Sequence, residues 1–350
     1  MKTVLILGAN GRFGQAATQA FAQAGWRVLA QMRRASVAPL PTGATALALP
    51  LADSAALCAQ AGTVHAVVHA VNPVYTRWDA EAMPALQQGM AAARALGALF
   101  MLPGNVYNFG ETMPPLLAED TPQRASNDKG RMRVAMEDAL RDRSAQDSAQ
   151  DSAQVSTRGS TQGLRSVVIR AGDFYGCGSG SWFDQAIVKS IRQGKLVYPG
   201  PLDLPHAWAY LPDLARAFVA VAAMPPQRAF ETLHFAGHTL TGSELLAALQ
   251  AAAETLGLRP SRGWRTGGMP WGLIRAVGLV HPPWRELARM SYLWRVPHAL
   301  SDDALARAVG PLQATPLQQA LRASLLDLGS GSTTPVRPAA LSSRREPARR

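Results

Sequence analysis

The sequence predicts an α/β protein built on a doubly wound parallel sheet. In the first half of its 350 residues, short apolar runs alternate with alanine-rich helical stretches, and a glycine-rich turn directly follows the first run. Such alternation is typical of βαβ units, whose strands lie parallel. The hydrophobic fraction of 47% and the charged fraction of 17% provide for a large core. We therefore expect this sheet together with a smaller, mainly helical C-terminal substrate lobe.

Six apolar runs are predicted to form the strands of the sheet, and they lie at residues 3–7, 28–31, 46–49, 65–69, 98–102 and 166–170. Beyond them the pattern loosens into predicted helices at 182–193, 213–224 and 243–256 and a short strand at 233–235. We therefore expect residues 1–170 to form the core domain. Residues 171–328 are expected to form the substrate lobe, with some elements returning to the core.

Two segments lack the apolar periodicity of a packed element. Residues 144–163 contain an imperfect Ser-Ala-Gln-Asp repeat, and residues 329–350 are rich in Gly, Ser, Thr, Pro and Arg. Polar segments of this kind bury too little apolar surface to offset the entropy lost on ordering. We therefore expect a disordered insertion at 144–163 and a disordered tail at 329–350.

Charge and cysteine content exclude several classes of protein. The formal net charge is +11, but the basic residues are scattered along the chain, so we expect no nucleic-acid partner. Two cysteines cannot build a disulfide framework, and no Cys/His spacing suggests a metal site. The apolar runs are too short for a membrane span or a signal peptide. The sequence thus predicts a cytoplasmic protein without stable membrane insertion, and it leaves a homodimer open.

The turn after the first predicted strand carries the pattern of a dinucleotide-binding site. It leads into a helical run at 15–24 and reads Gly8-Ala9-Asn10-Gly11-Arg12-Phe13-Gly14. Gly8 permits the tight turn, Gly11 lets a pyrophosphate approach the backbone, and Gly14 permits close helix–strand packing. The N–H groups at the start of the helix bind the phosphates. We therefore expect a Rossmann-type domain in which this turn binds the dinucleotide.

The end of the second predicted strand indicates which dinucleotide is bound. It carries Arg33 and Arg34 where an acidic residue would bind a ribose 2′-hydroxyl. Guanidinium groups pair with phosphate, so we expect NADP, with NAD as the alternative. Asp53 is expected either to reach the adenine or to cap the following helix. Asn72, after the fourth strand, is expected to lie along the ribose.

Three further landmarks follow the predicted strands in order. They are Val106-Tyr107, the segment Arg170-Ala171-Gly172-Asp173-Phe174-Tyr175-Gly176 and the segment Ala209-Tyr210-Leu211-Pro212-Asp213. Together with the two-residue spacing of the glycines in the 8–14 turn, they resemble the short-chain dehydrogenase/reductase superfamily. The resemblance is greatest to its NAD-dependent epimerase/dehydratase group, and it covers about residues 1–325.

The resemblance implies a chemistry that this chain does not carry in full. It implies a tyrosine acid/base whose pKa is lowered by a lysine four residues later, and a serine or threonine that orients the substrate oxygen. None of the six tyrosines is followed by such a lysine. Aligned on Glu137, the tyrosine position holds Lys129 and the lysine position holds Arg133. The standard catalytic set is therefore missing.

Other side chains are candidates for the roles of the missing tyrosine and serine. Lys129 is a candidate proton donor if burial or neighbouring cations bring its pKa toward neutrality. Asn105 and Tyr107 lie where the serine is expected and are further catalytic candidates. Arg133 stays protonated and is expected to hold the nicotinamide ribose.

Two functions from different classes fit these features. One is an NADP(H)-binding epimerase, dehydratase or reductase that acts on a small carbonyl or sugar-nucleotide-like molecule with a non-standard acid/base set. The other is a non-catalytic dinucleotide-binding protein, a redox sensor or an assembly protein, because fold alone does not establish activity. Three more polar residues fit either a catalytic or a purely structural role, namely Asp173, Tyr175 and His206.

Overall fold

A seven-stranded parallel sheet forms the centre of the computed structural model, which describes residues 1–34, 39–154, 163–225 and 228–330. Its strand order is β11-β7-β5-β4-β1-β2-β3, and every neighbouring pair runs parallel. The strands are β1 Thr3–Leu7, β2 Arg27–Gln31, β3 Ala44–Leu47, β4 Ala66–His69, β5 Leu99–Asn105, β7 Ser166–Ala171 and β11 Phe230–Phe235. The predicted Rossmann-type α/β fold is therefore confirmed.

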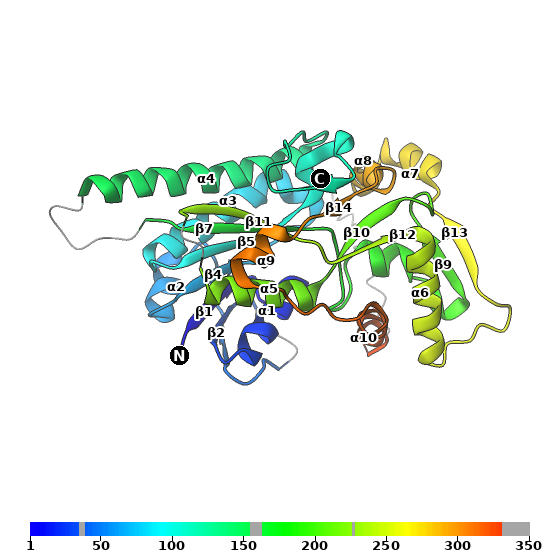
Figure 1. Ribbon diagram of the computed structural model, residues 1–350, viewed down its shortest axis with the longest axis horizontal. Coiled ribbons are helices and arrows are strands. Elements are labelled where there is room, and N and C mark those ends of the chain that lie inside the picture. The colour runs from blue at the N-terminus through cyan, green and yellow to red at the C-terminus, as the bar shows by residue number, and fades with distance from the viewer. Residues whose placement is uncertain (35–38, 155–162, 226–227, 331–350) are drawn as a thin grey trace, which may run out of the picture.

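Helices cover both faces of the sheet (Figure 1). One face carries α1 (Arg12–Gln23), α5 (Leu211–Ala223) and α9 (Asp303–Val309), and the other carries α2 (Ser54–Ala61), α3 (Trp78–Ala95) and α4 (Asp128–Gln154). In β1, Ile6 packs on the α1 face, whereas Leu5 and Leu7 pack on the opposite face. Because both faces are covered, residues 4–7 of the strand are all apolar, which explains the uninterrupted run.

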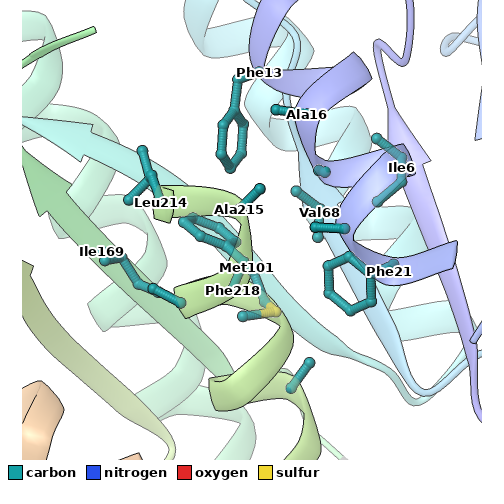
Figure 2. Close-up of a cluster of buried hydrophobic side chains, with 14 of the residues drawn as sticks. Ile6, Phe13, Ala16, Phe21, Val68, Met101, Ile169, Leu214, Ala215 and Phe218 are labelled. Atoms are coloured by element: carbon teal, nitrogen blue, oxygen red, sulfur yellow. The ribbon is translucent and has the colours of Figure 1, made fainter. Parts of the chain in front are cut away.

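The core beneath α1 fixes the start of that helix. Figure 2 shows Phe13 and Phe218 facing one another, and their rings meet edge to face with centroids 4.9 Å apart. Ile6 and Val68 from the sheet belong to the same buried cluster. Since Phe13 is the second residue of α1, its packing also holds the preceding glycine turn in place.

The C-terminal lobe has short strands, two packed helices and a helical hairpin. Its elements are β8 Asp173–Tyr175, β10 Pro205–Tyr210, β12 His238–Thr241, β9 Lys195–Tyr198, β13 Arg265–Gly268, α6 Gly242–Thr255, α7 Trp271–Gly278, α8 Pro282–Arg289 and α10 Leu317–Ser330. Two-residue strands β6 (Leu116–Leu117) and β14 (Ala299–Leu300) pair with each other. β11 also comes from this half of the chain, and it pairs with β7 in the central sheet.

The helix expected at 182–193 forms only as two short turns. A π-helical turn spans Phe183–Ile187 and a 3₁₀ turn spans Ile191–Gln193. Gly194 follows in the left-handed region with φ 70°, and the N–H of Lys195 donates to the Ser190 carbonyl at 3.1 Å. This reversal starts β9, so a continuous helix cannot form.

The expectation of disorder from residue 144 is wrong for residues 144–154, because α4 continues to Gln154. Ser144 and Asp147 lie on the buried side of the helix. The two hydroxyl groups of Ser144 and Ser166 lie 2.8 Å apart, and the Asp147 carboxylate accepts from the N–H of Leu164 at 3.0 Å. These partners lie across the fold, so the local composition could not reveal them. Residues 155–162 lie outside the described part of the chain.

The predicted disordered tail at 329–350 is also helical in its first two residues. Gly329 and Ser330 belong to α10, whereas residues 331–350, the rest of the predicted tail, lie outside the described residues. Within the residues that the structure describes, none of the helices has the combination of length and apolarity that a membrane span requires.

Candidate functional site

A cleft of about 1110 Å³ runs along the carboxyl ends of the central strands. Ligands of open α/β sheets bind at this edge, where the strand order reverses on either side of β1. The structure brings most of the predicted site residues to the cleft, namely Gly8, Asn10, Gly11, Arg12, Phe13, Arg33, Arg34, Asn72, Asn105, Tyr107 and Arg133. Gly14, Asp53 and Lys129 do not line it.

The glycine turn forms a cradle that side chains would fill. Gly8 has φ +79°, and a Cβ there would lie 3.0 Å from the N of Val71. The N–H of Gly11 donates to the Gly8 carbonyl at 3.0 Å, which closes the turn. A Cβ on Gly14 would overlap the Gly8 oxygen, so Gly14 serves the packing of α1 on β1. The backbone and the free N–H groups at the start of α1 thus fit a pyrophosphate.

Arg12 links the two sides of the cleft. Its guanidinium group donates to the Gly176 carbonyl at 2.7 Å, across 164 residues of sequence. Burial lowers the pKa of Arg12, although the nearby Asp184 opposes this shift. The side chain therefore places a positive charge between the glycine turn and the substrate lobe.

Arg33 and Arg34 lie exposed at the end of β2, at one end of the cleft. The Asn10 amide donates to the Arg34 carbonyl at 2.9 Å and ties the glycine turn to this segment. Asp53 instead accepts from the N–H of Ala56 at 3.2 Å and caps α2. The capping interpretation of Asp53 therefore fits the structure better than a contact with adenine.

Sequence reasoning missed Gln31, which holds the glycine turn from below. Its amide oxygen accepts from the N–H of Gly8 at 3.0 Å, and its amide nitrogen donates to the Leu49 carbonyl at 2.6 Å. The side chain is almost fully buried. A polar residue at the end of an otherwise apolar strand was the available signal, because a buried amide needs partners.

Arg133 faces the other end of the cleft. Its guanidinium carbon lies 4.9 Å from the Trp78 ring centroid, and the group donates to the Pro103 carbonyl at 3.2 Å. The Trp78 indole N–H in turn donates to the Pro73 carbonyl at 2.8 Å. Arg133 thus presents a held positive charge at the ends of β4 and β5.

Lys129 lies one turn earlier on α4 and points elsewhere. Its ammonium group is 3.4 Å from the Glu286 carboxylate and 3.6 Å from that of Asp79, and the side chain is buried. It also lies 5.7 Å from the Trp78 ring centroid. These contacts hold the ammonium group outside the cleft, so they do not support a proton donor at the active site.

Asn105 and Tyr107 both reach the cleft, but Asn105 has a structural role as well. Its side-chain oxygen accepts from the N–H of Tyr107 at 3.0 Å and caps the 3₁₀ segment Val106–Thr112. Tyr107 is 5% exposed, and part of its surface lines the cleft. Tyr175 does not line it, because its hydroxyl group meets Nδ1 of His238 at 3.0 Å in the lobe.

His69, at the end of β4, lines the cleft, and it was not among the site residues predicted from the sequence. It is 1% exposed, and neither ring nitrogen has a hydrogen-bond partner among the described residues. Burial, reinforced by the charge of Arg133, lowers the pKa of His69 to about 3. The imidazole is therefore neutral.

A buried ion pair sets the position of α4 against the sheet. The Arg170 guanidinium donates to the Glu137 carboxylate at 2.6 Å, and both side chains are almost fully buried. Asn108 donates to the same carboxylate at 2.9 Å. Arg170 also lies 3.3 Å from Nε2 of His234, whose pKa falls to about 4 through burial and this positive charge. Glu137 thereby fixes which side chains of α4 reach the cleft.

Asp173 at the cleft pairs with His206, which comes from another strand and does not itself line the cleft. Asp173 follows β7 and lines the cleft, and its Oδ2 lies 3.0 Å from Nε2 of His206 on β10. The His206 ring stacks on Trp294 with centroids 4.4 Å apart and an interplanar angle of 5°. Both polar candidates thus form one pair, although no sequence pattern indicates that they meet.

The family model for NAD-dependent epimerases and dehydratases matches residues 4–232. The chain belongs to this family. No curated protein matches it in sequence.

Three solved structures show the same fold at low identity. MoeE5, in complex with UDP-glucose and NAD, is 20% identical with a TM-score of 0.66, over 93% of this chain and 97% of that one. WbmH of Bordetella bronchiseptica, in complex with NAD⁺, is 16% identical with a TM-score of 0.67, over 95% and 99%. UDP-glucose 4-epimerase of Thermotoga maritima, with UDP-glucose, is 14% identical with a TM-score of 0.67, over 93% and 98%.

Proposed function

We propose that this family member is an NADP(H)-dependent enzyme of the epimerase, dehydratase or reductase kind, with a non-standard acid/base set. The observation that carries the proposal is the cleft itself. It joins a backbone cradle for a pyrophosphate, two arginines at one end and ionisable side chains at the other. The substrate class is a small molecule with a carbonyl or carbinol carbon, including sugar-nucleotide-like compounds.

The residues present fit the cofactor in three places. The 8–14 turn would hold the pyrophosphate, Arg33 and Arg34 would pair with the 2′-phosphate, and Arg133 would lie near the nicotinamide ribose. When bound, NADP supplies a hydride acceptor or, when reduced, a hydride donor. The chain's own part is to orient the cofactor and to move a proton on the substrate.

The solved structures support this assignment by analogy. MoeE5 was determined with both UDP-glucose and NAD, and WbmH with NAD⁺. Those ligands belong to those proteins, and they make a nicotinamide cofactor and a sugar nucleotide the first compounds to test here.

A non-catalytic role is the second candidate, and one observation favours it. Lys129, which stands at the tyrosine position, is held by Glu286 and Asp79 outside the cleft. If no other group moves a proton, the protein would bind NADP(H) as a sensor or assembly protein. Both candidates predict cofactor binding, so only a chemical readout separates them.

Two measurements test the proposal in order. Fluorescence titration with NADPH and NADH should show saturable binding with tighter binding of NADPH. NADPH labelled with tritium at nicotinamide C4 is then incubated with the protein and a panel of aldoses, hydroxyketones and 2-oxo acids. UDP-glucose has no free carbonyl to accept a hydride, so it is incubated with NADP⁺ instead, and the formation of reduced nicotinamide is followed. Tritium transfer to a panel compound, or reduction of NADP⁺ in the presence of UDP-glucose, supports the enzyme. Cofactor binding without either reaction favours the non-catalytic role. Absence of NADPH binding would refute both.

A further inference from the structure

The strand order shows which half of the dinucleotide lies near which residues. Arg33 and Arg34 follow β2, on one side of β1, whereas β4, β5 and β7 lie on the other side. With the pyrophosphate at the turn after β1, the adenine half lies over β2 and the nicotinamide half lies over β4, β5 and β7. Asp173, two residues beyond the end of β7, therefore lines the nicotinamide end of the cleft.

Asp173 is a buried carboxylate with one oxygen engaged. Its side chain is 10% exposed, and Oδ2 lies 3.0 Å from Nε2 of His206. Within the described residues, Oδ1 has no hydrogen-bond partner, and Asp173 itself lines the cleft. A buried carboxylate is costly unless it is paired and hydrogen-bonded, so a free oxygen at a cleft indicates a ligand contact.

His206 is held so that it cannot turn away from Asp173. Its ring is buried, stacks on Trp294 and lies 4.9 Å from the Trp208 centroid. The His298 ring approaches it edge-on at 4.5 Å. Asp173 is fixed as well, because β8 pairs with β10 in the register Asp173 to Trp208. The pair is thus a preorganised unit.

Two other titratable side chains near the pair, His298 and Tyr198, stay neutral. His298 donates through Nδ1 to the Val296 carbonyl at 2.9 Å, and burial together with His206 lowers the pKa of His298 to about 3, so it is neutral. Burial, reinforced by the charge of Asp173, raises the pKa of Tyr198 well above its usual value, so its phenol also stays neutral.

We propose that Asp173 is the acid–base residue of this cleft and that His206 is its positioning residue. The inference rests on the proposed function and supplies the group that replaces the missing phenol. In oxidation of a carbinol, the O–H proton would pass to Oδ1 of Asp173 as the carbonyl forms, and bound NADP⁺ would supply the acceptor for the C–H hydride. In reduction, protonated Asp173 would return the proton to the carbonyl oxygen, with bound NADPH as the source of the hydride.

A comparison of NADP⁺ and NADPH binding tests whether Asp173 lies beside the nicotinamide, and it needs no known substrate. A carboxylate beside the nicotinamide attracts the cationic ring of NADP⁺ but not the neutral ring of NADPH. In Asp173→Asn, which keeps the shape, we expect NADP⁺ to bind about three- to tenfold more weakly, with NADPH affinity nearly unchanged. The matched control Asp203→Asn removes an exposed carboxylate from the turn before β10 and should change neither affinity.

The role of His206 is tested by conservative rescue. His206→Gln retains a side-chain N–H near the position of Nε2, so it should keep most of the NADP⁺/NADPH affinity ratio of the unaltered protein. His206→Leu should lower the NADP⁺/NADPH affinity ratio by weakening NADP⁺ binding, while NADPH binding stays intact. Equal behaviour of the two variants would contradict a positioning role.

Label transfer tests the chemistry on any compound that accepts tritium from labelled NADPH. General acid–base catalysis contributes about 10²–10⁴-fold, so Asp173→Asn should lower kcat at least a hundredfold with little change in the KM for NADPH. An unchanged NADP⁺/NADPH affinity ratio in Asp173→Asn would overturn this inference alone. Failure of the unaltered protein to bind NADPH would overturn the proposed function as well.

Discussion

Glu137 on α4 and Arg170 on β7 form a buried ion pair, with the guanidinium N and the carboxylate O 2.6 Å apart. Asn108 and Gln123 add hydrogen bonds to the same carboxylate. The pair lies one helical turn beyond Arg133, which lines the cleft. The orientation of α4, and so the choice of the cationic side chain that reaches the site, depends on this contact.

Removing one partner of the pair should destabilise the fold strongly. Glu137→Leu leaves the Arg170 guanidinium buried without its counter-charge, and the expected loss is about 3–5 kcal/mol in the free energy of unfolding. Urea denaturation monitored by circular dichroism measures it. Glu137→Gln keeps the shape and should cost less, whereas a near-neutral Glu137→Leu would show that the pair does not hold α4.

Gly11→Val should block the cofactor without unfolding the protein. Gly11 has φ −72°, which other residues adopt, and a Cβ there would lie 3.3 Å from the Gly8 oxygen. The side chain would occupy the pyrophosphate site, so NADPH should no longer raise Tm. By contrast, Gly14→Val should lower Tm of the free protein, because its Cβ would overlap the backbone of the turn. A full NADPH-induced shift in Gly11→Val would remove the site assignment.

The preference for NADP should depend on Arg33 and Arg34. Loss of a charge-assisted contact with the 2′-phosphate costs about 1.5–3 kcal/mol, which is about ten- to a hundredfold in affinity. The double variant Arg33→Ala/Arg34→Ala should therefore bind NADPH and NADH with similar Kd values. Arg27→Ala, at the exposed start of β2, is the matched control and should keep the preference. Equal binding of both cofactors by the unaltered protein would disprove the claim.

The polar repeat in α4 should contribute to stability through Asp147. Its carboxylate is 2% exposed, accepts from the N–H of Leu164 and lies 3.1 Å from Arg94. Asp147→Ala leaves the buried N–H without that acceptor, so we expect a loss of about 1–3 kcal/mol in urea denaturation. Asp142→Ala, on the exposed side of the same helix, should change little. Equal stability of the two variants would mean that the segment does not pack.

Stability should fall as the pH drops below 6.5. The pKa values of His69, His234 and His298 are lowered to about 3, 4 and 3, chiefly by burial. Between these values and 6.5 the unfolded chain binds more protons than the folded one, so each histidine removes up to about 1.4 kcal/mol per pH unit. The urea concentration at the midpoint of unfolding, measured from pH 7 to pH 4, should decrease as the pH falls.

One variant isolates the contribution of a single histidine. His69→Leu removes a titrating group and two unpartnered buried nitrogens, so it should be near-neutral at pH 7 and should flatten the pH dependence. His281→Leu, at an exposed position before α8, should leave the slope unchanged. An unaltered slope in His69→Leu would contradict the neutral, buried state of His69.

Local patterns were enough to predict the sheet and the cofactor turn. The apolar runs are long enough to be strands buried on both faces, and the glycines of the 8–14 turn are needed by contacts within a few residues, such as Gly11 N–H to the Gly8 carbonyl. The carboxyl ends of parallel strands meet at one edge of the sheet, so the turn after the first strand also indicates where the cofactor binds. Such features depend on neighbours in sequence, so the sequence by itself determined them.

Only the tertiary structure decided which polar side chains share the site. Lys129 and Arg133 are one turn apart on α4, yet only Arg133 lines the cleft, because Glu286 and Asp79 hold Lys129 elsewhere. Asp173 and His206 come together across 33 residues through the pairing of β8 with β10. Packing between distant elements makes these contacts, and no local pattern of composition or periodicity encodes them.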